Sequence, residues 1–460
     1  MSVSATDTRR HQHSLTVPKP TIYWRETEPV EAGEALQGAV RCDVCIVGGG
    51  YTGLWTAHHL KRADPSLEIH LVEADYAGAG ASGHNDGFIT PTIGHSLWTL
   101  VHRFGVEASR TAYASVGRSI VEIQRFCRQQ GLERDHEPNG FYLVATSPAQ
   151  MRRLEVDLSL AEQMGARGAT DLLLGEDARA RVGSPAILGA LQGGGALVNP
   201  HRLVRALARV VGEEGVQVHE RTPALEIERV TGGHRITTPQ GSVSAERVVL
   251  ATNAYQHRFR AFHRQVKPVW SYAAVSEPLS ARRLAEVHWP GREGFVEARN
   301  FILFARLTAE DRLLLGGGPA PYFYGSDMDQ RHVRNPSITV VLREALARFF
   351  PPWRDLRFTH AYGGCIAVTR DLVPHVGEQS NGLIYGYGYC GNGIAMSHTA
   401  GKAMRDLVLG RESGYSKLLF VNGREPSFPA EPIGYLAARG LSRALQFQDR
   451  HPSLIRRQLI

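Results

Sequence analysis

Three glycines near the beginning of the chain have a spacing that can bind phosphate. Gly48, Gly50 and Gly53 follow the apolar run 42–47 and precede a run with helical periodicity. This pattern, between a predicted strand and a predicted helix, is typical of the loop that binds the pyrophosphate of a dinucleotide. Gly48 permits a tight turn, Gly50 lets the backbone approach the phosphates, and Gly53 lets helix and strand pack closely. The helix N-terminus adds free N–H groups and the positive end of its dipole.

An acid follows at the distance that this interpretation requires. Glu73 ends a second apolar run, 69–72, and lies 20 residues after Gly53. In this position a carboxylate accepts hydrogen bonds from the ribose in the adenosine half of a dinucleotide. Strand, glycine loop, helix and strand form one βαβ unit, so the sequence predicts a Rossmann-like nucleotide-binding domain.

A second loop of small residues indicates which dinucleotide is bound. It covers residues 78–87 and includes four candidate cofactor contacts, namely Ala81, Ser82, Gly83 and Asn85. A simple NAD-binding domain has no need of such a loop. A flavin domain does, because the chain must pass close to the pyrophosphate and the isoalloxazine ring of FAD. The sequence therefore favours FAD.

A third glycine-rich segment precedes a predicted helix near the C-terminal end and consists of Gly391, Asn392, Gly393 and Ile394. Its two glycines allow a ligand to approach the backbone closely. A helix N-terminus beside the pyrimidine edge of a flavin would stabilise the negative charge that develops there on reduction. We therefore expect these four residues to bind the cofactor as well.

The order of these motifs resembles that of a known family. Residues 43–87 are similar to the D-amino-acid-oxidase-type (DAO) family of FAD-dependent oxidoreductases, and within it to the gamma-glutamylputrescine oxidoreductase-like amine oxidases. The resemblance extends over residues 22–409 and includes the segments 248–255 and 268–272. In the family the second loop typically reads Gly-Ala-Ser-Gly-Arg-Asn-Gly-Gly. This chain has His84 in place of the arginine and Asp86 in place of a glycine.

The resemblance implies FAD as the cofactor and an enzyme that oxidises a small amine or amino acid. A hydride leaves the carbon next to nitrogen, water hydrolyses the resulting imine, and oxygen or another acceptor reoxidises the flavin. Because the cofactor carries the chemistry, no general base is required. The candidates for catalysis or substrate contact are His84, Tyr255, Tyr272 and Arg306, with Trp270 and Phe304 beside them in the matched segments. Arg306 could pair with a carboxylate or phosphonate.

Two alternatives to amine oxidation remain open. One is oxidation of an alcohol-type substrate such as a glycerol phosphate, and the other is an RNA-modifying flavoprotein. The second is prompted by the net charge of +7, from 52 Lys+Arg against 45 Asp+Glu. Both signs are spread along the chain without a basic stripe, so we expect no nucleic-acid partner.

Two further possibilities concern covalent flavin and metal. His84 or Cys365 could carry a covalent link, but their positions match attachment sites poorly, and we expect non-covalent FAD. Cys42 and Cys45 resemble a metal or redox pair. However, residues three apart in a strand point to opposite faces, and no second cysteine pair follows. We therefore expect no metal site.

The elements that position these residues are predicted from periodicity. Helices are expected over 54–63, 96–130, 149–164, 200–214, 340–350 and 394–409, and strands over 42–47, 69–72, 244–251, 269–275, 301–304, 313–316 and 383–387. Nucleotide-binding signals lie at both ends of the chain. We therefore predict an α/β fold in which a Rossmann-like FAD-binding domain (38–100, 196–265 and 355–412) is interleaved with an α+β, mixed-sheet substrate domain (101–195 and 266–354). Residues 1–37 form a tail and lead-in, and residues 413–460 form a C-terminal extension.

Composition agrees with a folded enzyme. The 460 residues are 43% hydrophobic and 21% charged, which excludes a disordered chain. Five cysteines are too few for a disulfide scaffold and fit a reduced, cytoplasmic setting. No run approaches the ~18 apolar residues of a membrane helix. The polar first 20 residues indicate a short flexible tail and no signal peptide. Residues 435–460 predict a packed amphipathic helix with a basic outer face, with membrane-surface binding as the alternative.

Overall fold

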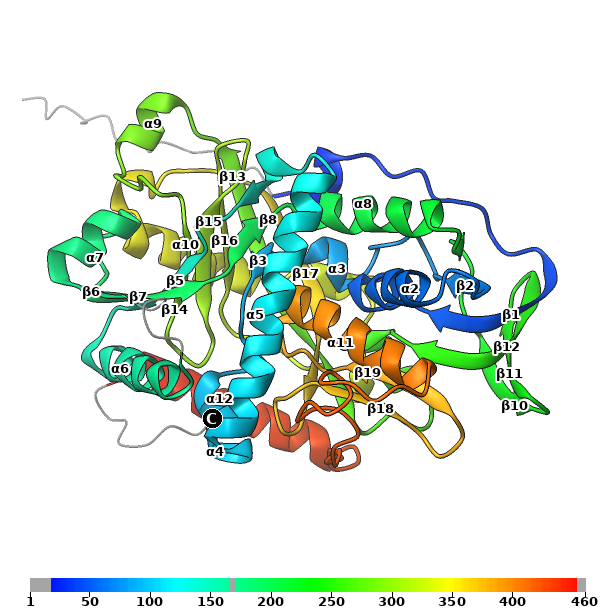
Figure 1. Ribbon diagram of the computed structural model, residues 1–460. Coiled ribbons are helices and arrows are strands. Elements are labelled where there is room, and N and C mark those ends of the chain that lie inside the picture. The colour runs from blue at the N-terminus through cyan, green and yellow to red at the C-terminus, as the bar shows by residue number, and fades with distance from the viewer. Residues whose placement is uncertain (1–17, 166–170, 453–460) are drawn as a thin grey trace, which may run out of the picture.

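The computed structural model describes residues 18–165 and 171–452. The tail expected at the N-terminus up to residue 17, and residues 453–460 of the expected extension, lie outside the described residues. The described chain contains two large sheets and one small sheet, with helices on their outer faces (Figure 1). This arrangement confirms the predicted α/β fold class.

The first sheet carries the predicted βαβ unit. Strand β1 (Gly38–Val47) runs parallel to β2 (Ile69–Val72) and to β12 (Gly241–Leu250), and β19 (Leu383–Tyr387) pairs with the C-terminal part of β12. The remaining strands are β9 (Gln217–His219), β10 (Glu226–Val230), β11 (Gly233–Thr238) and β18 (His375–Glu378). Side chains on both faces of the central strands are buried, as is usual for parallel strands.

Four helices share one apolar core with this sheet. They are α2 (Tyr51–Ala63), α5 (Val106–Gln129), α8 (Pro200–Glu213) and α11 (Gly393–Val408). Helix α8 begins where the Asn199 side chain accepts hydrogen bonds from two free backbone N–H groups and proline fills the first helical position. The helix expected over 96–130 is divided into α4 (Leu97–Phe104) and α5, because Gly105 adopts a φ of 78°. Such a positive φ ends a helix.

The second sheet has the strand order β17-β13-β16-β15-β14-β5-β7-β6. Its strands are β5 (Phe141–Ala145), β6 (Leu172–Leu174), β7 (Gly189–Gly194), β13 (Val266–Pro278), β14 (Gly294–Glu297), β15 (Leu303–Leu307), β16 (Arg312–Gly317) and β17 (Phe358–Thr369). Helix α10 (Pro336–Phe349) packs on one face around the buried rings of Phe295 and Trp353. The helices α6 (Pro148–Gln163), α7 (Gly175–Val182) and α9 (Ala281–Ala285) lie around the same half of the molecule (Figure 1).

A small third sheet lies between the two large ones. It consists of β3 (Phe88–Ile89), β8 (Ala196–Val198) and β4 (His136–Glu137). Strand β3 follows directly on the loop that leaves α3 (Ala81–His84), so its pairing with β8 fixes where this loop ends. A short helix, α1 (Tyr23–Thr27), places Tyr23 and Trp24 in a cluster with residues of β13, β15 and β17.

Two expected boundaries do not coincide with the sheets. Strand β17 pairs with β13 from Val266–Thr369 to Val275–His360, so the start of the expected segment 355–412 belongs to the second sheet. Helix α5 packs on the first sheet, although residues 101–195 were expected in the substrate domain. In both cases the partner lies far away in the sequence, and local periodicity does not reveal it.

The C-terminal extension forms the predicted amphipathic helix, α12 (Ile433–Arg450), which lies at the lower side of the molecule in Figure 1. Both of its ends are attached to segments of the second sheet or next to it. Lys267 Nζ lies 2.7 Å from a Glu431 carboxylate oxygen just before the helix. At the other end the Asp449 carboxylate accepts hydrogen bonds from the backbone N–H groups of Asn300 and Phe301, both at 2.9 Å.

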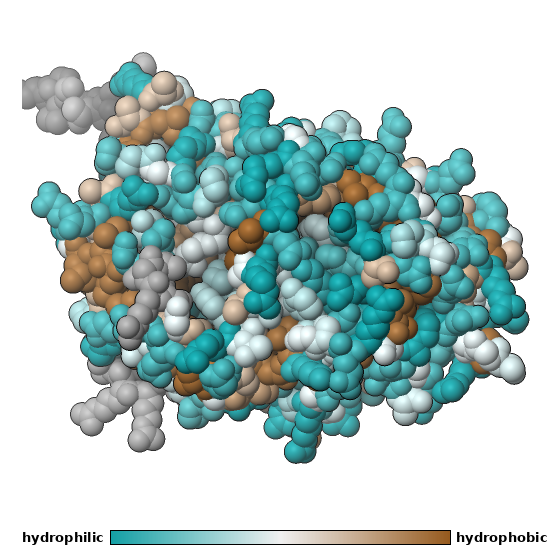
Figure 2. Space-filling model, viewed as in Figure 1, coloured by the Kyte–Doolittle hydropathy of each residue, from teal (hydrophilic) through white to brown (hydrophobic). Residues whose placement is uncertain are grey.

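The surface is mainly hydrophilic on the face that Figure 2 shows, and its hydrophobic patches are separate from one another. No helix in the described part of the chain is long and apolar enough to span a membrane.

The contact between α2 and α11 gives a test of this fold. A Cβ atom at Gly401 would lie 3.0 Å from the backbone N of Thr56 and 3.0 Å from the Cβ of Trp55. We expect Gly401→Val to lower the free energy of unfolding by about 1–3 kcal/mol, because overpacking forces the helices apart. Urea unfolding measures this.

The control is Gly117→Val in α5, where an added Cβ meets nothing within 4 Å. Valine and glycine differ by only a few tenths of a kcal/mol in helix propensity. Equal losses in the two variants would show that close packing at Gly401 is unimportant.

Candidate active site

A cavity of about 2080 Å³ lies between the two large sheets. On one side it is lined by the C-terminal ends of the parallel strands, including Val47 of β1 and Val72 of β2. On the other side it is lined by β13, β15 and β17 of the second sheet. Ligands of open α/β sheets bind outside the carboxyl ends of the strands, so this cavity is the expected position of a site.

The first glycine loop lines this cavity and needs its glycines. Gly48 has a φ of +110°, and a Cβ there would lie 2.7 Å from the carbonyl oxygen of Ala251. A Cβ at Gly53 would lie 2.0 Å from the carbonyl oxygen of Gly48, so this glycine is required for packing and does not itself line the cavity. At the cavity wall, Gly50 begins α2 without a side-chain cap. Apart from the Tyr51 N–H, which donates to Ser82 Oγ, the first N–H groups of α2 have no side-chain partner within the described residues and are available at the cavity.

Glu73 is held in place by the loop that it follows. One carboxylate oxygen accepts a hydrogen bond from the Gly49 N–H at 2.6 Å, and the other accepts one from the Asp75 N–H at 3.1 Å. Burial raises the pKa of the Glu73 carboxyl, although these hydrogen bonds oppose the shift. Each oxygen keeps a lone pair for a further donor, such as a ribose hydroxyl.

The second loop is folded by its own side chains. Ser82 Oγ accepts a hydrogen bond from the Tyr51 N–H at 2.9 Å and thereby joins this loop to the start of α2. Asn85 Nδ2 donates to the carbonyl oxygens of Ala81 (3.0 Å) and Ser82 (2.8 Å). Ala81, Ser82 and Asn85 line the cavity, whereas Gly83 does not. A Cβ at Gly83 would lie 2.5 Å from the carbonyl oxygen of Gly78, so that glycine serves the turn.

The third glycine segment brings a second helix N-terminus to the cavity. Gly391, Asn392, Gly393 and Ile394 all line it. The Asn392 side chain is not a cap of α11, because it binds the segment before α4: Oδ1 accepts from Thr90 Oγ1 at 3.0 Å and Nδ2 donates to the Gly94 carbonyl oxygen at 2.8 Å. In the part of the chain that the structure describes, the first N–H groups of α11 therefore have no side-chain cap.

The groups that line the cavity fit FAD. One cavity contains two helix N-termini without side-chain caps, a backbone-anchored carboxylate at the end of β2, and an extension toward the second sheet. A ligand that meets all of these must be long and must carry a ribose and phosphates. FAD has this chemistry, and the donor groups present fit it.

Aromatic side chains from the second sheet form the opposite wall. Trp270, Tyr272 and Phe304 are buried and line the cavity. The Tyr272 hydroxyl donates to the His332 carbonyl oxygen at 2.9 Å, and burial raises the pKa of Tyr272 to about 12. Tyr255 also lines the cavity but is 40% exposed, and the Arg258 guanidinium carbon lies 5.0 Å from the centre of its ring.

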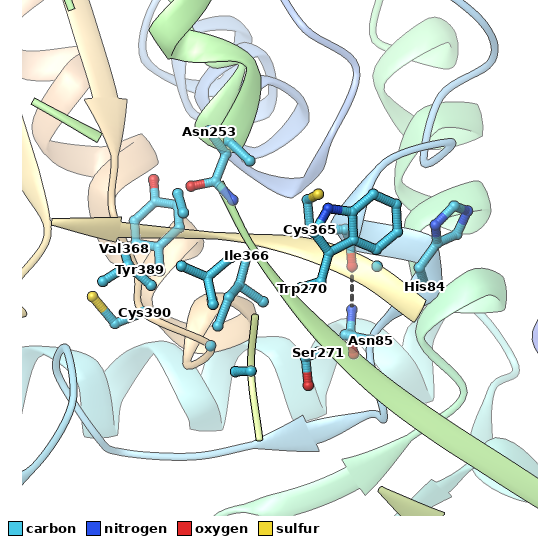
Figure 3. A pocket seen from close by; sticks show the side chains of 18 of the residues that line it. His84, Asn85, Asn253, Trp270, Ser271, Cys365, Ile366, Val368, Tyr389 and Cys390 are labelled. Atoms are coloured by element: carbon cyan, nitrogen blue, oxygen red, sulfur yellow. Dashed lines mark hydrogen bonds between the residues drawn. The ribbon is translucent and has the colours of Figure 1, made fainter. Parts of the chain in front are cut away.

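His84 and Cys365 lie on this side of the cavity (Figure 3). Burial and the nearby Arg25 guanidinium lower the pKa of His84 to about 3, so its imidazole is neutral at physiological pH. Cys365 lies opposite Trp270 in the β13–β17 pair. Burial raises the pKa of its thiol to about 12, which makes the thiolate rare.

Arg306 does not lie where a substrate anion could reach it. It is 2% exposed and is absent from the cavity wall. Its Nη1 donates to the carbonyl oxygens of Val198 (2.8 Å), Asp86 (3.3 Å) and Gly87 (3.4 Å). The guanidinium therefore supports the end of the second loop from behind, in place of the expected pairing with a carboxylate or phosphonate.

Several wall residues were not among the sequence candidates. Tyr362 of β17, Asp86 of the second loop and Tyr435 of α12 all line the cavity. Asp86 carried a signal, since an acid replaces a glycine of the family loop at this position. Tyr362 and Tyr435 carried none, because β17 and α12 reach the cavity only through long-range packing.

Comparison with known proteins gives consistent results. Residues 43–407 match the family described as DAO, FAD dependent oxidoreductase. Gamma-glutamylputrescine oxidoreductase of Escherichia coli (strain K12) is 28% identical over 385 residues, which cover 82% of this chain and 86% of that protein. Glycine oxidase of Geobacillus kaustophilus is 25% identical over 380 residues, or 82% of this chain and 95% of that protein. The crystal structure of glycine oxidase from Geobacillus kaustophilus covers 84% of this chain and 100% of its own, with a TM-score of 0.71 at 21% identity.

The position of Glu73 predicts a defect in cofactor retention. Glu73→Ala removes the acceptor of the Gly49 N–H and the acceptor offered to a ribose. A hydrogen bond to a charged group contributes about 1.5–3 kcal/mol, so we expect the dissociation constant of FAD to rise roughly 10- to 150-fold. Fluorescence titration of the apoprotein with FAD measures it. Glu246→Ala, at an exposed acid on β12 of the same sheet, should change it less than twofold. Unchanged FAD binding by Glu73→Ala would exclude the proposed contact.

The position of Arg306 predicts a structural defect. Arg306→Ala leaves the carbonyl oxygens of Asp86, Gly87 and Val198 without this donor, and we expect a loss of about 1–3 kcal/mol in the free energy of unfolding. Arg306→Lys should recover only part of it, because lysine lacks the planar fork of donors. Any remaining activity should fall by the same factor for anionic and uncharged substrates. A loss of activity that is larger for the anionic substrate than for the uncharged one would show that Arg306 contacts the substrate.

Proposed function

The chain belongs to the DAO family of FAD-dependent oxidoreductases, and from this premise we propose that it oxidises a small amine or amino acid at the carbon next to nitrogen. One observation carries the proposal: a single cavity joins the glycine loop and Glu73 to the aromatic wall of the second sheet. The relatives named above, an amine oxidoreductase and an amino-acid oxidase, support the class of substrate.

The first residues proposed to hold FAD follow the C-terminal ends of β1 and β2. Gly48, Gly50 and the N-terminus of α2 would bind the pyrophosphate, and Glu73 would bind the adenosine ribose. Ser82 and Asn85 keep the second loop folded against α2. The flavin would be non-covalent, since burial raises the pKa of the Cys365 thiol to about 12 and makes its thiolate rare, and since the positions of His84 and Cys365 match attachment sites poorly.

When bound, FAD supplies the acceptor for the hydride that leaves the carbon next to nitrogen. The remaining tasks belong to the chain. Trp270, Tyr272 and Phe304 present flat, apolar surfaces that exclude water and orient an amine. The N-terminus of α11 directs the positive end of its dipole into the cavity, which favours negative charge at the ligand edge beside it.

The proposal also includes the electron acceptor of the flavin and the cellular location of the protein. Oxygen or another small acceptor would reoxidise the flavin. The five cysteines at positions 42, 45, 127, 365 and 390 are free thiols, which supports a reducing, cytoplasmic setting.

Anaerobic reduction of the flavin tests the function. The FAD-loaded protein is mixed without oxygen with butylamine, N-methylbutylamine, norvaline or glycerol 3-phosphate, and the loss of the yellow absorbance is followed by stopped flow. We expect bleaching by at least one nitrogen compound. Its rate should rise with pH, because only the neutral amine has a free lone pair to assist loss of the hydride. Bleaching by glycerol 3-phosphate and by none of the nitrogen compounds would replace amine oxidation by alcohol oxidation.

A further inference from the structure

Asp86 places a carboxyl group in the cavity wall without a partner. It follows α3, precedes β3 and lines the cavity. Its Oδ1 is buried and accepts no hydrogen bond, and within residues 18–165 and 171–452 no lysine, arginine or histidine nitrogen lies within 4.0 Å of its carboxyl oxygens. The side chain as a whole is half-buried, so Oδ1 is shielded by the protein and the other carboxyl oxygen remains accessible to a donor from a ligand in the cavity.

The groups around Asp86 supply no hydrogen-bond donor to its carboxyl group among the described residues, so a donor must come from the ligand. The Arg306 guanidinium binds the backbone carbonyl of Asp86 and not its side chain, and it also faces Glu137 on its other side. The Tyr362 hydroxyl of β17 is buried and has no hydrogen-bond partner among the described residues. The rings of Phe88 and Phe304 pack edge to face with centres 5.7 Å apart and complete an apolar wall.

We propose that Asp86 receives the ammonium group of the amine substrate and accepts one of its protons, and that the preferred substrates carry no carboxylate on the reacting carbon. The proposal rests on the function proposed above. In the step, one N–H bond of the ammonium breaks and one O–H bond forms on Asp86. The cation and carboxylate become a neutral amine and a neutral carboxylic acid, so the net charge of the pair is zero before and after.

Transfer of the proton is favourable because the site is poorly hydrated. Burial disfavours the charged form of both groups, and therefore favours the neutral pair over the ion pair. Burial raises the pKa of Asp86 to about 7, with the Arg306 guanidinium opposing the shift, and this brings the group toward the basicity of a proton acceptor at neutral pH. His84 is not suited to the task, because its pKa is lowered to about 3.

The same arrangement excludes a carboxylate on the reacting carbon. An α-amino acid that placed its ammonium at Asp86 would also bring its own carboxylate close to that acid. Like charges in a cavity repel, and Arg306, the nearby cation, is engaged with carbonyl oxygens behind the wall. An amine such as butylamine has no such group, whereas norvaline is butylamine with a carboxylate on the reacting carbon.

A binding experiment tests Asp86 without turnover. tert-Butylamine carries no hydrogen on the carbon next to nitrogen, so it binds as an ammonium ion but cannot be oxidised. Its dissociation constant is measured on the FAD-loaded protein by isothermal titration calorimetry between pH 5 and pH 9. Asp86→Asn keeps the size of the side chain and removes its charge. Asp177→Asn, at an exposed acid of α7, is the control for net charge.

The charged or titratable groups that face Asp86 from neighbouring elements are Arg306 of β15 and Tyr362 of β17. The pKa of Tyr362 is raised far above neutrality and the Arg306 guanidinium stays charged, so among these three groups only Asp86 changes charge in this range. We expect binding to tighten from pH 5 to about pH 7 and then to level off. Asp86→Asn should bind at least tenfold more weakly at pH 8, equal to about 1.4 kcal/mol, and its affinity should not change between pH 5 and pH 7. Asp177→Asn should stay within twofold of the unchanged protein.

Single-turnover reduction supplies the second measurement. The unchanged protein should be reduced faster by butylamine than by norvaline, and Asp86→Asn should reduce this ratio at least tenfold. Asp86→Glu, which keeps the charge, should recover part of the affinity for tert-butylammonium. Equal affinities for Asp86→Asn and the unchanged protein, or the absence of saturable binding to the unchanged protein, would overturn the role of Asp86.

Two other outcomes are distinct from these. A change of FAD retention in Asp86→Asn without a change in tert-butylammonium binding would assign Asp86 to the cofactor and refute the proposal. If no nitrogen compound bleaches the flavin, the proposed function fails, while the calorimetric result still decides whether Asp86 binds an ammonium ion.

Discussion

The contact between α2 and α11 is the constraint on which the rest of the site depends. The two helices come from opposite ends of the chain, and at Gly401 the absence of a side chain lets α11 lie directly against the backbone of α2. Because the helices share one core with β1, their N-termini open into the same cavity. The hydrogen bond between Thr52 Oγ1 and the Tyr389 hydroxyl, at 2.9 Å, joins the two segments again at the cavity wall. A ligand that binds both helix ends therefore stabilises a contact between the two ends of the chain.

The local parts of this arrangement could be predicted from the sequence. Gly48, Gly50 and Glu73 lie in a strand–loop–helix–strand unit whose geometry depends on neighbouring residues, so their spacing was sufficient. The predicted helix 200–214 and the observed α8 (Pro200–Glu213) differ by one residue, because Asn199 and Pro200 are local signals for a helix start. The packing of α5 on the first sheet and the pairing of β17 with β13 depend on distant partners, and the sequence of either segment alone does not specify them.

The roles of the charged residues in and behind the cavity wall could not be predicted from their residue types. Arg306 had the chemistry of an anion-binding residue, but a positive φ of 77° at Gly87 turns the backbone so that carbonyl oxygens surround the guanidinium. A Cβ at Gly87 would lie 2.5 Å from Arg306 Nη1, which shows how closely the loop encloses this group. Engagement of Arg306 with the backbone leaves Asp86 without a partner. One arginine therefore determines both the shape of the loop and the negative character of the wall next to it.

The C-terminal helix shows how the wall is completed by a segment outside the family match. The match ends at residue 407, yet α12 (Ile433–Arg450) contributes Tyr435 and Leu441 to the cavity. The helix has little packing of its own, since only Gly434 and Leu445 are buried along its length, so its position depends on the ion pair at one end and the hydrogen bonds at the other. The glycine loop and Glu73 are set by the first sheet, whereas the opposite wall is assembled from α12, β13 and β17. Substitutions in this second set can alter the shape and charge of the wall without disturbing the strand–loop–helix unit. The proposed substrate wall is thus structurally separate from the proposed cofactor loop.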